Sequence, residues 1–345
     1  MERRTFLTGA AKVGAAVTVG APLLLSTEAR AAESITFVSW GGSYGDFVKE
    51  YWMKPFTKET GIEVVYVSGP DLARAKAQVQ TNNVEWDIFD APGSLAMAGV
   101  KEGLWEPVDT KLIDRSRYVK WVNDTIMPGY LFVGGIAHDS SRSKNPPTTF
   151  KEMWDVQKFP GRRAFRTRSS ETLEAALLAD GVPPEKLYPL DIERAFKSLE
   201  KIKPHVKKWF SETAQGISLI QTNEVDYSYT YTSRVKAANE SGIPLDISLK
   251  QCIAGMNYFP ILKGSKKKAE AMKFLEFITR PAQQVVLPKI AGVPAVKGIG
   301  DKGMDAASKR WIPDLSDPNN VILNDEFWGE HFVAVDKRFK EWILT

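Results

Sequence analysis

Residues 34–56, SITFVSWGGSYGDFVKEYWMKPF, decide the fold, because they hold a strand, a turn and a helix in immediate succession. Over 34–39, β-branched and aromatic residues nearly alternate with smaller polar ones, which predicts a β-strand. The WGG tripeptide at 40–42 interrupts this alternation. Ser43 and Asp46 then form a capping-box pattern, and aromatic residues follow at helical spacing. We therefore predict a strand, a glycine turn and an amphipathic helix.

The glycine turn between this strand and helix is the first candidate binding site. Such a turn leaves free backbone N–H groups at a helix N-terminus, beside the carboxyl end of a strand, where open α/β sheets bind ligands. The candidate residues are Trp40, Gly41, Gly42, Ser43 and Tyr44. The alternative is a turn that only joins the two elements.

A catalytic interpretation also exists, since residues 41–45, GGSYG, match the G-x-S-x-G pattern of a serine nucleophile. That pattern requires an oxyanion-hole loop from an earlier strand, and an acid followed by a histidine downstream. Ser43, however, follows the first strand of the mature chain. The histidines are His138, His205 and His331, the last within a helical pattern. A secreted serine hydrolase is therefore a remote alternative, and we expect no enzymatic activity.

The composition is that of an ordinary globular chain. The 345 residues are 43% hydrophobic and 26% charged, which is enough for two domains with their own cores. About half of the net charge of +4 lies in the first 31 residues, so no nucleic-acid surface is expected. Cys252 is the single cysteine, which excludes an internal disulfide and a cysteine metal site. The glycine spacing does not match a dinucleotide fingerprint, and we expect no cofactor.

Residues 1–31 have the pattern of an export signal. A basic start is followed by an apolar run, and the small-x-small sequence ARA at 29–31 predicts cleavage after Ala31. The sequence RRTFL at 3–7 resembles the twin-arginine consensus for export of folded proteins, with an ordinary Sec signal as the alternative. Either route predicts a periplasmic protein.

Strand and helix patterns continue along the chain. Up to residue 102 they follow the order β-α-β-α-β-α, which predicts a parallel sheet with Ser94 at the same edge as Trp40. A stretch rich in Ser, Asn and Pro at 140–148 predicts a linker. The following segment is again α/β, and its residues 226–232, DYSYTYT, alternate as a strand with three tyrosines on one face. These tyrosines are not adjacent, and no cluster of ligands accompanies them, so we expect no metal site.

Several longer segments occur in a recognisable order after the opening strand and Trp-Gly turn. They are WDIFDAPGSLAMAGVKEGLWEPVD at 86–109, PTTFKEMWDVQKFPGRRAFR at 147–166, NEVDYSYTYTSRVKAANESGIPLDI at 223–247 and KKAEAMKFLEFITRPAQQ at 267–284. Their order and spacing resemble those of the spermidine/putrescine-type extracellular solute-binding proteins of ABC importers. The likeness covers essentially the whole mature chain, although no single motif in it is strong.

The resemblance implies a two-lobed α/β fold of the periplasmic-binding-protein type, in which each lobe is a mainly parallel sheet flanked by helices and a solute lies in the hinged cleft. The expected parts are lobe 1 at 32–138 and 253–300, lobe 2 at 139–252, C-terminal helices packing back on the lobes at 301–345, and hinges near 137–138 and 249–252. The implied partners are a small solute and an inner-membrane ABC permease. The protein is expected to be a monomer.

Polyamine binders of this family hold a dication between aromatic walls and acidic residues. By resemblance, Trp40 and Tyr231 match aromatic positions and Glu171 matches one acid. Two further acidic positions instead hold Arg168 and Asn257. These two changes should disfavour a dication.

Arg168 is instead a candidate for binding a carboxylate. With Ser169 and Ser170 it precedes a predicted helix, where a guanidinium group, hydroxyls and the helix dipole favour an anion. The alternative is a surface ion pair between Arg168 and Glu171.

Arg234, after the tyrosine strand, is a second anion candidate with a comparable alternative, and Gln215 could hydrogen-bond either end of a ligand. The acids that could hold an ammonium group are Glu171, Asp90 and Asp226. The two aromatic residues matched above would add cation–π contacts. We therefore predict a small zwitterion, an ω-amino acid such as 4-aminobutyrate, with a polyamine as the alternative.

Overall fold

The computed structural model describes residues 33–299 and 304–345, so the predicted export signal at 1–31 lies outside the described residues. The first sheet is small and entirely parallel, in the order β2-β1-β3, as the sequence pattern predicts. Its strands are β1 (Ser34–Ser39), β2 (Glu63–Ser68) and β3 (Ile88–Phe89). The parallel order brings their carboxyl ends to one edge, where the predicted site begins.

Strand β1 is followed by one helical stretch. It consists of α1 (Ser43–Val48), the π-helical turn η1 (Lys49–Met53) and α2 (Lys54–Thr60). The predicted capping box of Ser43 and Asp46 is wrong: Gly42 is the N-cap, and no side chain caps this helix. The reason is that Ser43 is the first helical residue, one position too late for an N-cap side chain.

The second sheet has nine strands, with the main path β12-β10-β5-β8-β6-β7. Its long central strands, β5 (Ile126–Asp139) and β10 (Ile253–Pro260), run side by side in opposite directions. Strand β8 (Tyr227–Tyr231) pairs antiparallel with β5. At the far edge, β6 (Arg163–Arg166) pairs in parallel with β8 and with β7 (Val206–Phe210). Parallel pairing therefore dominates the first sheet and this edge, but not the centre of the second sheet.

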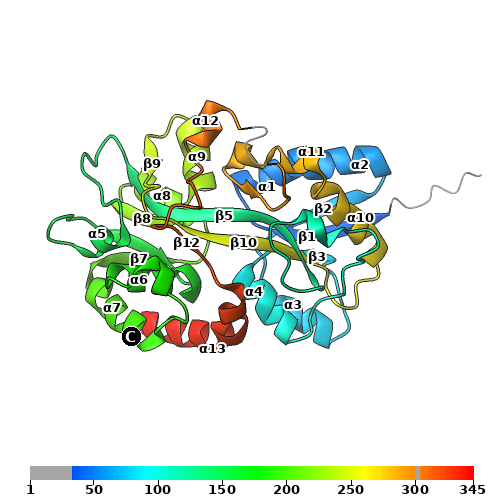
Figure 1. Cartoon of the computed structure of the whole chain (residues 1–345), viewed down its shortest axis with the longest axis horizontal. Coiled ribbons are helices and arrows are strands. Elements are labelled where there is room, and N and C mark those ends of the chain that lie inside the picture. Colours follow the sequence, from blue (N-terminus) through cyan, green and yellow to red (C-terminus); the bar gives the residue numbers. More distant parts are fainter. Residues whose placement is uncertain (1–32, 300–303) are drawn as a thin grey trace, which may run out of the picture. The chain divides into compact units, whose positions relative to one another are not determined.

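The antiparallel centre has a topological reason. Figure 1 shows β5 and β10 extending between the group of helices that holds α1, α2 and α10 and the group that holds α5 to α9. The chain passes outward along β5 and returns along β10, so the two strands must oppose each other. The two-lobed α/β class is thus confirmed in a mixed form, whereas the lobe boundaries and hinge positions stay predictions.

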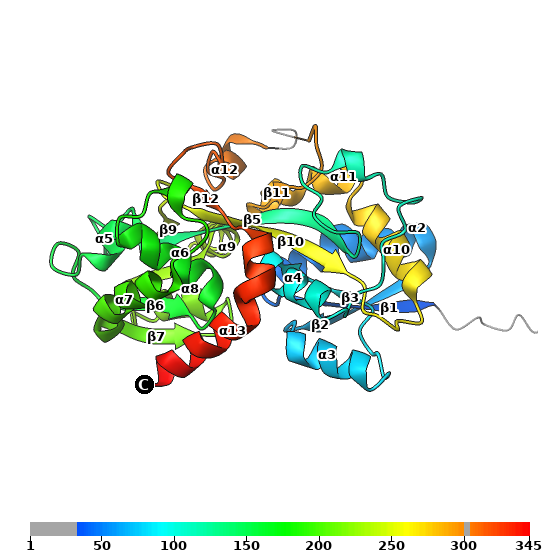
Figure 2. The same ribbon diagram turned by 60° about the horizontal axis from the view of Figure 1, so that its bottom comes forward.

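The C-terminal helix α13 (Asp325–Leu344) lies against α4 (Gly93–Lys101) and α6 (Ser169–Ala179), one from each side of the molecule (Figure 2). Its buried apolar residues are Trp328, Phe332, Val335 and Phe339. They recur at helical spacing and join the core that also covers α6 and α7. This helix therefore packs directly behind the segment that carries Arg168.

The remaining elements complete the two layers of helices around the sheets. The helices are α3 (Leu72–Gln80), α5 (Phe150–Trp154), α7 (Ile192–Ile202), α8 (Gln215–Gln221), α9 (Thr232–Glu240), α10 (Lys268–Ile278), α11 (Pro281–Gln284) and α12 (Ala306–Lys309). The short strands are β4 (Ala91–Pro92), β9 (Leu245–Ile247), β11 (Val293–Pro294) and β12 (Val321–Ile322). Within 33–299 and 304–345, none of the helices is both long and apolar enough to cross a bilayer.

Candidate ligand-binding site

A cavity of about 60 Å³ lies between the turn after β1, the middle of β5, the junction of β8 with α9, and residues 290–292. Six of the predicted ligand-binding residues line it: Trp40, Tyr44, Arg168, Tyr231, Arg234 and Asn257. Arg166, Tyr130 and Thr213 also line it and were not predicted. The structure thus brings residues from widely separated segments into one small site.

Asp90 lies beneath this cavity and anchors its walls. Its fully buried carboxylate accepts hydrogen bonds from Ser39 Oγ at 2.5 Å and Tyr44 OH at 2.9 Å. Trp40 Nε1 donates to it at 3.2 Å, and Asn257 Nδ2 donates as well. Asp90 does not itself line the cavity. It therefore positions three lining side chains, and its charge acts on the cavity from behind them.

The titration of Asp90 leads to a prediction about stability. Burial raises the pKa of Asp90 from 3.8 to about 6, so the folded state binds this proton more tightly than the unfolded state. The stability that protonation contributes is complete below about pH 4 and is lost as the pH rises through about 6. Through this group we expect the free energy of unfolding to fall by roughly 1 kcal/mol between pH 5 and pH 7.

Urea unfolding of the wild type and of Asp90→Asn at both pH values measures this contribution. The wild type should lose about 1 kcal/mol more than the variant over this interval. Equal losses in the two proteins would show that Asp90 does not titrate near pH 6.

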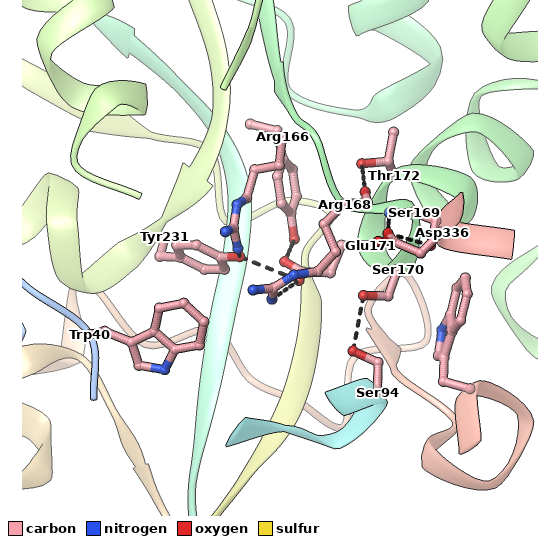
Figure 3. A network of polar contacts seen from close by, with 12 residues as sticks. Trp40, Ser94, Arg166, Arg168, Ser169, Ser170, Glu171, Thr172, Tyr231 and Asp336 are labelled. Carbon is pink, nitrogen blue, oxygen red and sulfur yellow. Dashed lines mark hydrogen bonds and ion pairs between the residues drawn. The ribbon is translucent and has the colours of Figure 1, made fainter. Parts of the chain in front are cut away.

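Arg168 presents a cation to the cavity from the N-terminal side of α6. Its guanidinium lies over the indole of Trp40, with Cζ 5.4 Å from the ring centroid (Figure 3). Its Nη1 is 3.5 Å from Glu171 Oε1, and the two side chains are only 12% and 2% exposed. The ion pair weighed from the sequence therefore exists, but it is buried beside the cavity instead of lying on the surface.

Arg166 is a lining residue that the sequence interpretation missed. It is 5% exposed, and its guanidinium donates to Tyr231 OH at 2.6 Å and to the Ser211 carbonyl at 2.9 Å. Its Nε has no hydrogen-bond partner within the described part of the chain. The available signal was its position, because Arg166 lies near the carboxyl end of a strand pattern, at the sheet edge where the other candidates were expected.

Arg234, on α9, reaches across to the glycine turn. It donates to Thr213 Oγ1 at 3.0 Å, and its Nη1 is 3.5 Å from Ser43 Oγ. Gly42 has a φ of 69°, and a Cβ at that position would lie 2.7 Å from Nη1, so both the backbone and this approach favour glycine. Ser43 thus contacts a guanidinium, which cannot serve as a general base, and this contact gives the hydrolase alternative no support.

Ser94, Ser169 and Ser170 lie beside the cavity and not in its lining. The hydroxyls of Ser94 and Ser170 are 3.2 Å apart and join α4 to α6 (Figure 3). Asp336 of α13 accepts both the backbone N–H of Ser169, at 2.8 Å, and its hydroxyl, at 3.0 Å. The predicted anion subsite on this helix N-terminus is therefore already occupied by a carboxylate of the protein itself.

The acids predicted to hold an ammonium group have partners within the protein. Glu171 accepts hydrogen bonds from Tyr229 OH at 2.8 Å and Tyr231 OH at 3.3 Å. Asp226 forms an ion pair with Arg162, with Nε 3.0 Å from Oδ2. Neither carboxylate lines the cavity.

Four further predicted residues also lie outside the lining: Gly41, Gly42, Ser43 and Gln215. Gln215 is exposed at the start of α8, where its Oε1 accepts the Glu212 N–H at 3.4 Å. Gly41 lies against β2, since a Cβ at that position would be 2.6 Å from Ser68 Oγ. Gly41 thus shapes the turn, and Gln215 makes no contact with the cavity.

Comparison with known proteins gives this geometry a context. Residues 51–311 match the model of the bacterial extracellular solute-binding proteins. The chain belongs to this family. It is 30% identical over 325 residues to a Pseudomonas aeruginosa protein named gamma-aminobutyric acid-binding protein, covering 90% of this chain and 91% of the relative. It is 23% identical over 327 residues to the spermidine/putrescine-binding periplasmic protein of Escherichia coli, with 90% of each chain covered.

Solved structures agree with this assignment. A GABA receptor shares 32% sequence identity and a TM-score of 0.81, covering 90% of this chain and 98% of the other. The protein AgtB of Agrobacterium tumefaciens, solved with agropinic acid, shares 27% identity and a TM-score of 0.84, covering 91% and 99%. The family predicted from the segment order is thereby confirmed. This solute-binding protein is an exported component of an ABC importer that binds a small molecule for delivery to a permease.

Proposed function

We propose that this solute-binding protein captures a small amino acid with a separated amine and carboxylate, such as 4-aminobutyrate. The observation that carries the proposal is the presence of three largely buried guanidinium groups around one small cavity. They belong to Arg166, Arg168 and Arg234. Among the described residues, no acidic side chain lines this cavity. A carboxylate would therefore be attracted, whereas a dication such as putrescine would be repelled.

Arg234 is the guanidinium best placed to bind the carboxylate. It is 7% exposed, and burial lowers its pKa, so the protein holds a poorly solvated cation at this position. Its hydrogen-bond partners are hydroxyl groups, and no carboxylate of the described residues pairs with it. Arg168, in contrast, already forms an ion pair with Glu171. An incoming carboxylate therefore gains most from Arg234.

The amine is expected at an aromatic wall of the cavity. The rings of Trp40 and Tyr231 already lie next to the guanidinium groups of Arg168 and Arg166, at 5.4 and 5.7 Å from the ring centroids. The free wall is the tilted pair of Tyr44 and Tyr130, whose ring centroids are 5.6 Å apart. Tyr44 and Asn257 both donate hydrogen bonds to the buried carboxylate of Asp90, and the negative charge of this carboxylate favours an ammonium group at this wall.

The size of the cavity also favours a small solute. One water requires about 10–15 Å³ in this measure, so about 60 Å³ accommodates on the order of half a dozen non-hydrogen atoms. This is close to the size of 4-aminobutyrate. The relative named for gamma-aminobutyric acid supports the same ligand class, while polyamine binding remains the alternative class.

The proposal predicts selective thermal stabilisation. A ligand at 100 times its Kd stabilises the native state by about 2.7 kcal/mol, which corresponds to a rise in Tm of several degrees. We expect this rise with 4-aminobutyrate, and a rise below about 1 °C with putrescine. Butyrate and 1-aminobutane are the controls that show whether both charged groups are needed. A larger rise with putrescine than with 4-aminobutyrate would replace the proposal with the polyamine alternative.

The proposal includes export by the twin-arginine route and action as a monomer without catalysis. The Arg3-Arg4 pair in the signal pattern supports the route. The contact between Ser43 and Arg234 leaves this serine without a general base at that position.

A further inference from the structure

We propose that Glu174, buried behind the cavity, is a positioning residue for ligand binding. Its carboxylate holds the backbone turn at Ser170 and Glu171, which in turn places Glu171 against Arg168 in the cavity wall. Glu174 therefore sets the affinity for the ligand without touching it. This inference rests on the proposed function, since it concerns the same cavity.

Glu174 joins three segments of the chain. It is 0% exposed, and its Oε2 accepts the backbone N–H of Glu171 at 2.7 Å. Its Oε1 accepts Tyr188 OH at 2.6 Å and Trp328 Nε1 of α13 at 2.7 Å. Both carboxylate oxygens thus accept hydrogen bonds, and they connect the C-terminal helix to the start of α6.

The turn that Glu174 holds is an unusual one. Ser170 has a ψ of 143°, and Glu171 has a φ of 75°, a region that side-chain-bearing residues seldom adopt. Such a conformation persists only where the surroundings hold it. The bond from the Glu171 N–H to the carboxylate three residues later is one half of a capping box, with Glu171 as the N-cap.

In a complete capping box the Glu171 side chain would accept the backbone N–H of Glu174, but it makes other contacts instead. Instead of capping α6, the Glu171 carboxylate points to Tyr229 and Tyr231 and lies 3.5 Å from Arg168. Figure 3 shows Arg168 extending from this turn toward Trp40, with Tyr231 and Arg166 nearby. The Glu171 side chain, which does not cap the helix, therefore holds Arg168 in place.

Loss of the bond to Glu174 would let the turn relax toward helical angles. The Glu171 carboxylate would then move away from the two tyrosines, and Arg168 would lose the carboxylate that fixes its position over Trp40. The cavity would keep its residues but not their arrangement. Weaker binding, more than unfolding, is the expected consequence.

The test compares Glu174→Met with Glu174→Gln. Methionine has a similar length but cannot accept the N–H of Glu171, whereas glutamine can still accept it through its carbonyl oxygen. By calorimetric titration with 4-aminobutyrate, we expect the Kd of Glu174→Met to rise about tenfold, and that of Glu174→Gln to stay within about threefold of wild type. Rescue by the conservative variant would separate this bond from the charge of the side chain.

Ser198→Ala is the matched control. The hydroxyl of Ser198, on α7, donates to the Ala176 carbonyl of α6 at 2.7 Å, so its removal weakens the contact between these two helices without altering the turn. The control should lower Tm but leave Kd unchanged. Equal Kd values for wild type and Glu174→Met would overturn the inference, and so would equal weakening by methionine and glutamine or by the control.

A crystal structure of Glu174→Met gives a readout that needs no ligand. We expect a negative φ at Glu171 and a carboxylate displaced from Tyr229. A retained positive φ with the carboxylate in place would overturn the inference. Failure of the wild type to bind 4-aminobutyrate would instead count against the proposed function, and the φ of Glu171 in the variant would still decide the role of Glu174.

Discussion

Replacing Arg234 with alanine is expected to weaken binding of 4-aminobutyrate by about 100-fold or more. Truncation of one member of a buried, hydrogen-bonded charge pair costs about 2–5 kcal/mol, which corresponds to a factor between roughly 30 and several thousand in Kd. Arg234 fits this case because it is 7% exposed and no carboxylate in 33–299 or 304–345 pairs with it. Isothermal titration of both proteins measures the loss.

Lys236→Ala is the matched control for this experiment. Lys236 lies two residues further along α9 and is similarly buried, at 5% exposure, but it pairs with Glu240 and does not line the cavity. Its loss should leave Kd unchanged. Arg168→Ala should weaken binding by about tenfold, because that charge is shared with Glu171. A larger loss for Arg168→Ala than for Arg234→Ala would place the carboxylate at Arg168.

Replacing Asp90 with alanine is expected to reduce both stability and affinity. The carboxylate accepts hydrogen bonds from Ser39, Tyr44 and two further donors, which would be left buried without an acceptor. A buried polar group without a partner costs about 1–3 kcal/mol, so we expect a loss of roughly 3 kcal/mol at pH 7 after partial relaxation. Because these donors line or support the cavity, Kd for 4-aminobutyrate should also rise by more than about tenfold.

Asp87→Ala separates the two effects. Asp87 is also buried, and it accepts hydrogen bonds from the Thr36 N–H at 2.8 Å and from Ser265 Oγ at 2.6 Å, but it does not line the cavity or contact its walls. Urea unfolding should show a loss of stability in both variants, whereas titration should show weaker binding only for Asp90→Ala. Equal Kd values in the two variants would show that Asp90 does not contribute specifically to ligand binding.

Much of the fold follows from local patterns. The alternation at 34–39, the glycines after Trp40 and the helical spacing beyond them correspond to β1, its turn and α1 to α2, because each depends on residues only a few positions apart. The same holds for the tyrosine strand β8. The predicted capping box was wrong because it placed the N-cap of the helix one residue too late, at Ser43 instead of Gly42. Sequence patterns define the ends of a helix less well than its middle.

The candidate site was predicted in part. Trp40, Arg168 and Arg234 line the cavity, because each stands near the end of a strand or the start of a helix at the predicted sheet edge. Glu171 has the right position in the chain but the wrong direction, since its φ of 75° turns the side chain toward the tyrosines. A periodic pattern of residue types gives no information about the sign of φ at one position, so this orientation of Glu171 could not be predicted.

The sequence by itself determined the α/β class, the family and the cationic character of the site, because periodicity, segment order and residue type are properties of neighbouring positions. Only the tertiary structure decided which charges face the ligand. Asp90 accepts a hydrogen bond from Asn257, and Asp336 accepts one from Ser169; the two partners are 167 residues apart in the chain in each case. Such contacts depend on how distant elements pack, and packing between distant elements leaves no local pattern in the sequence.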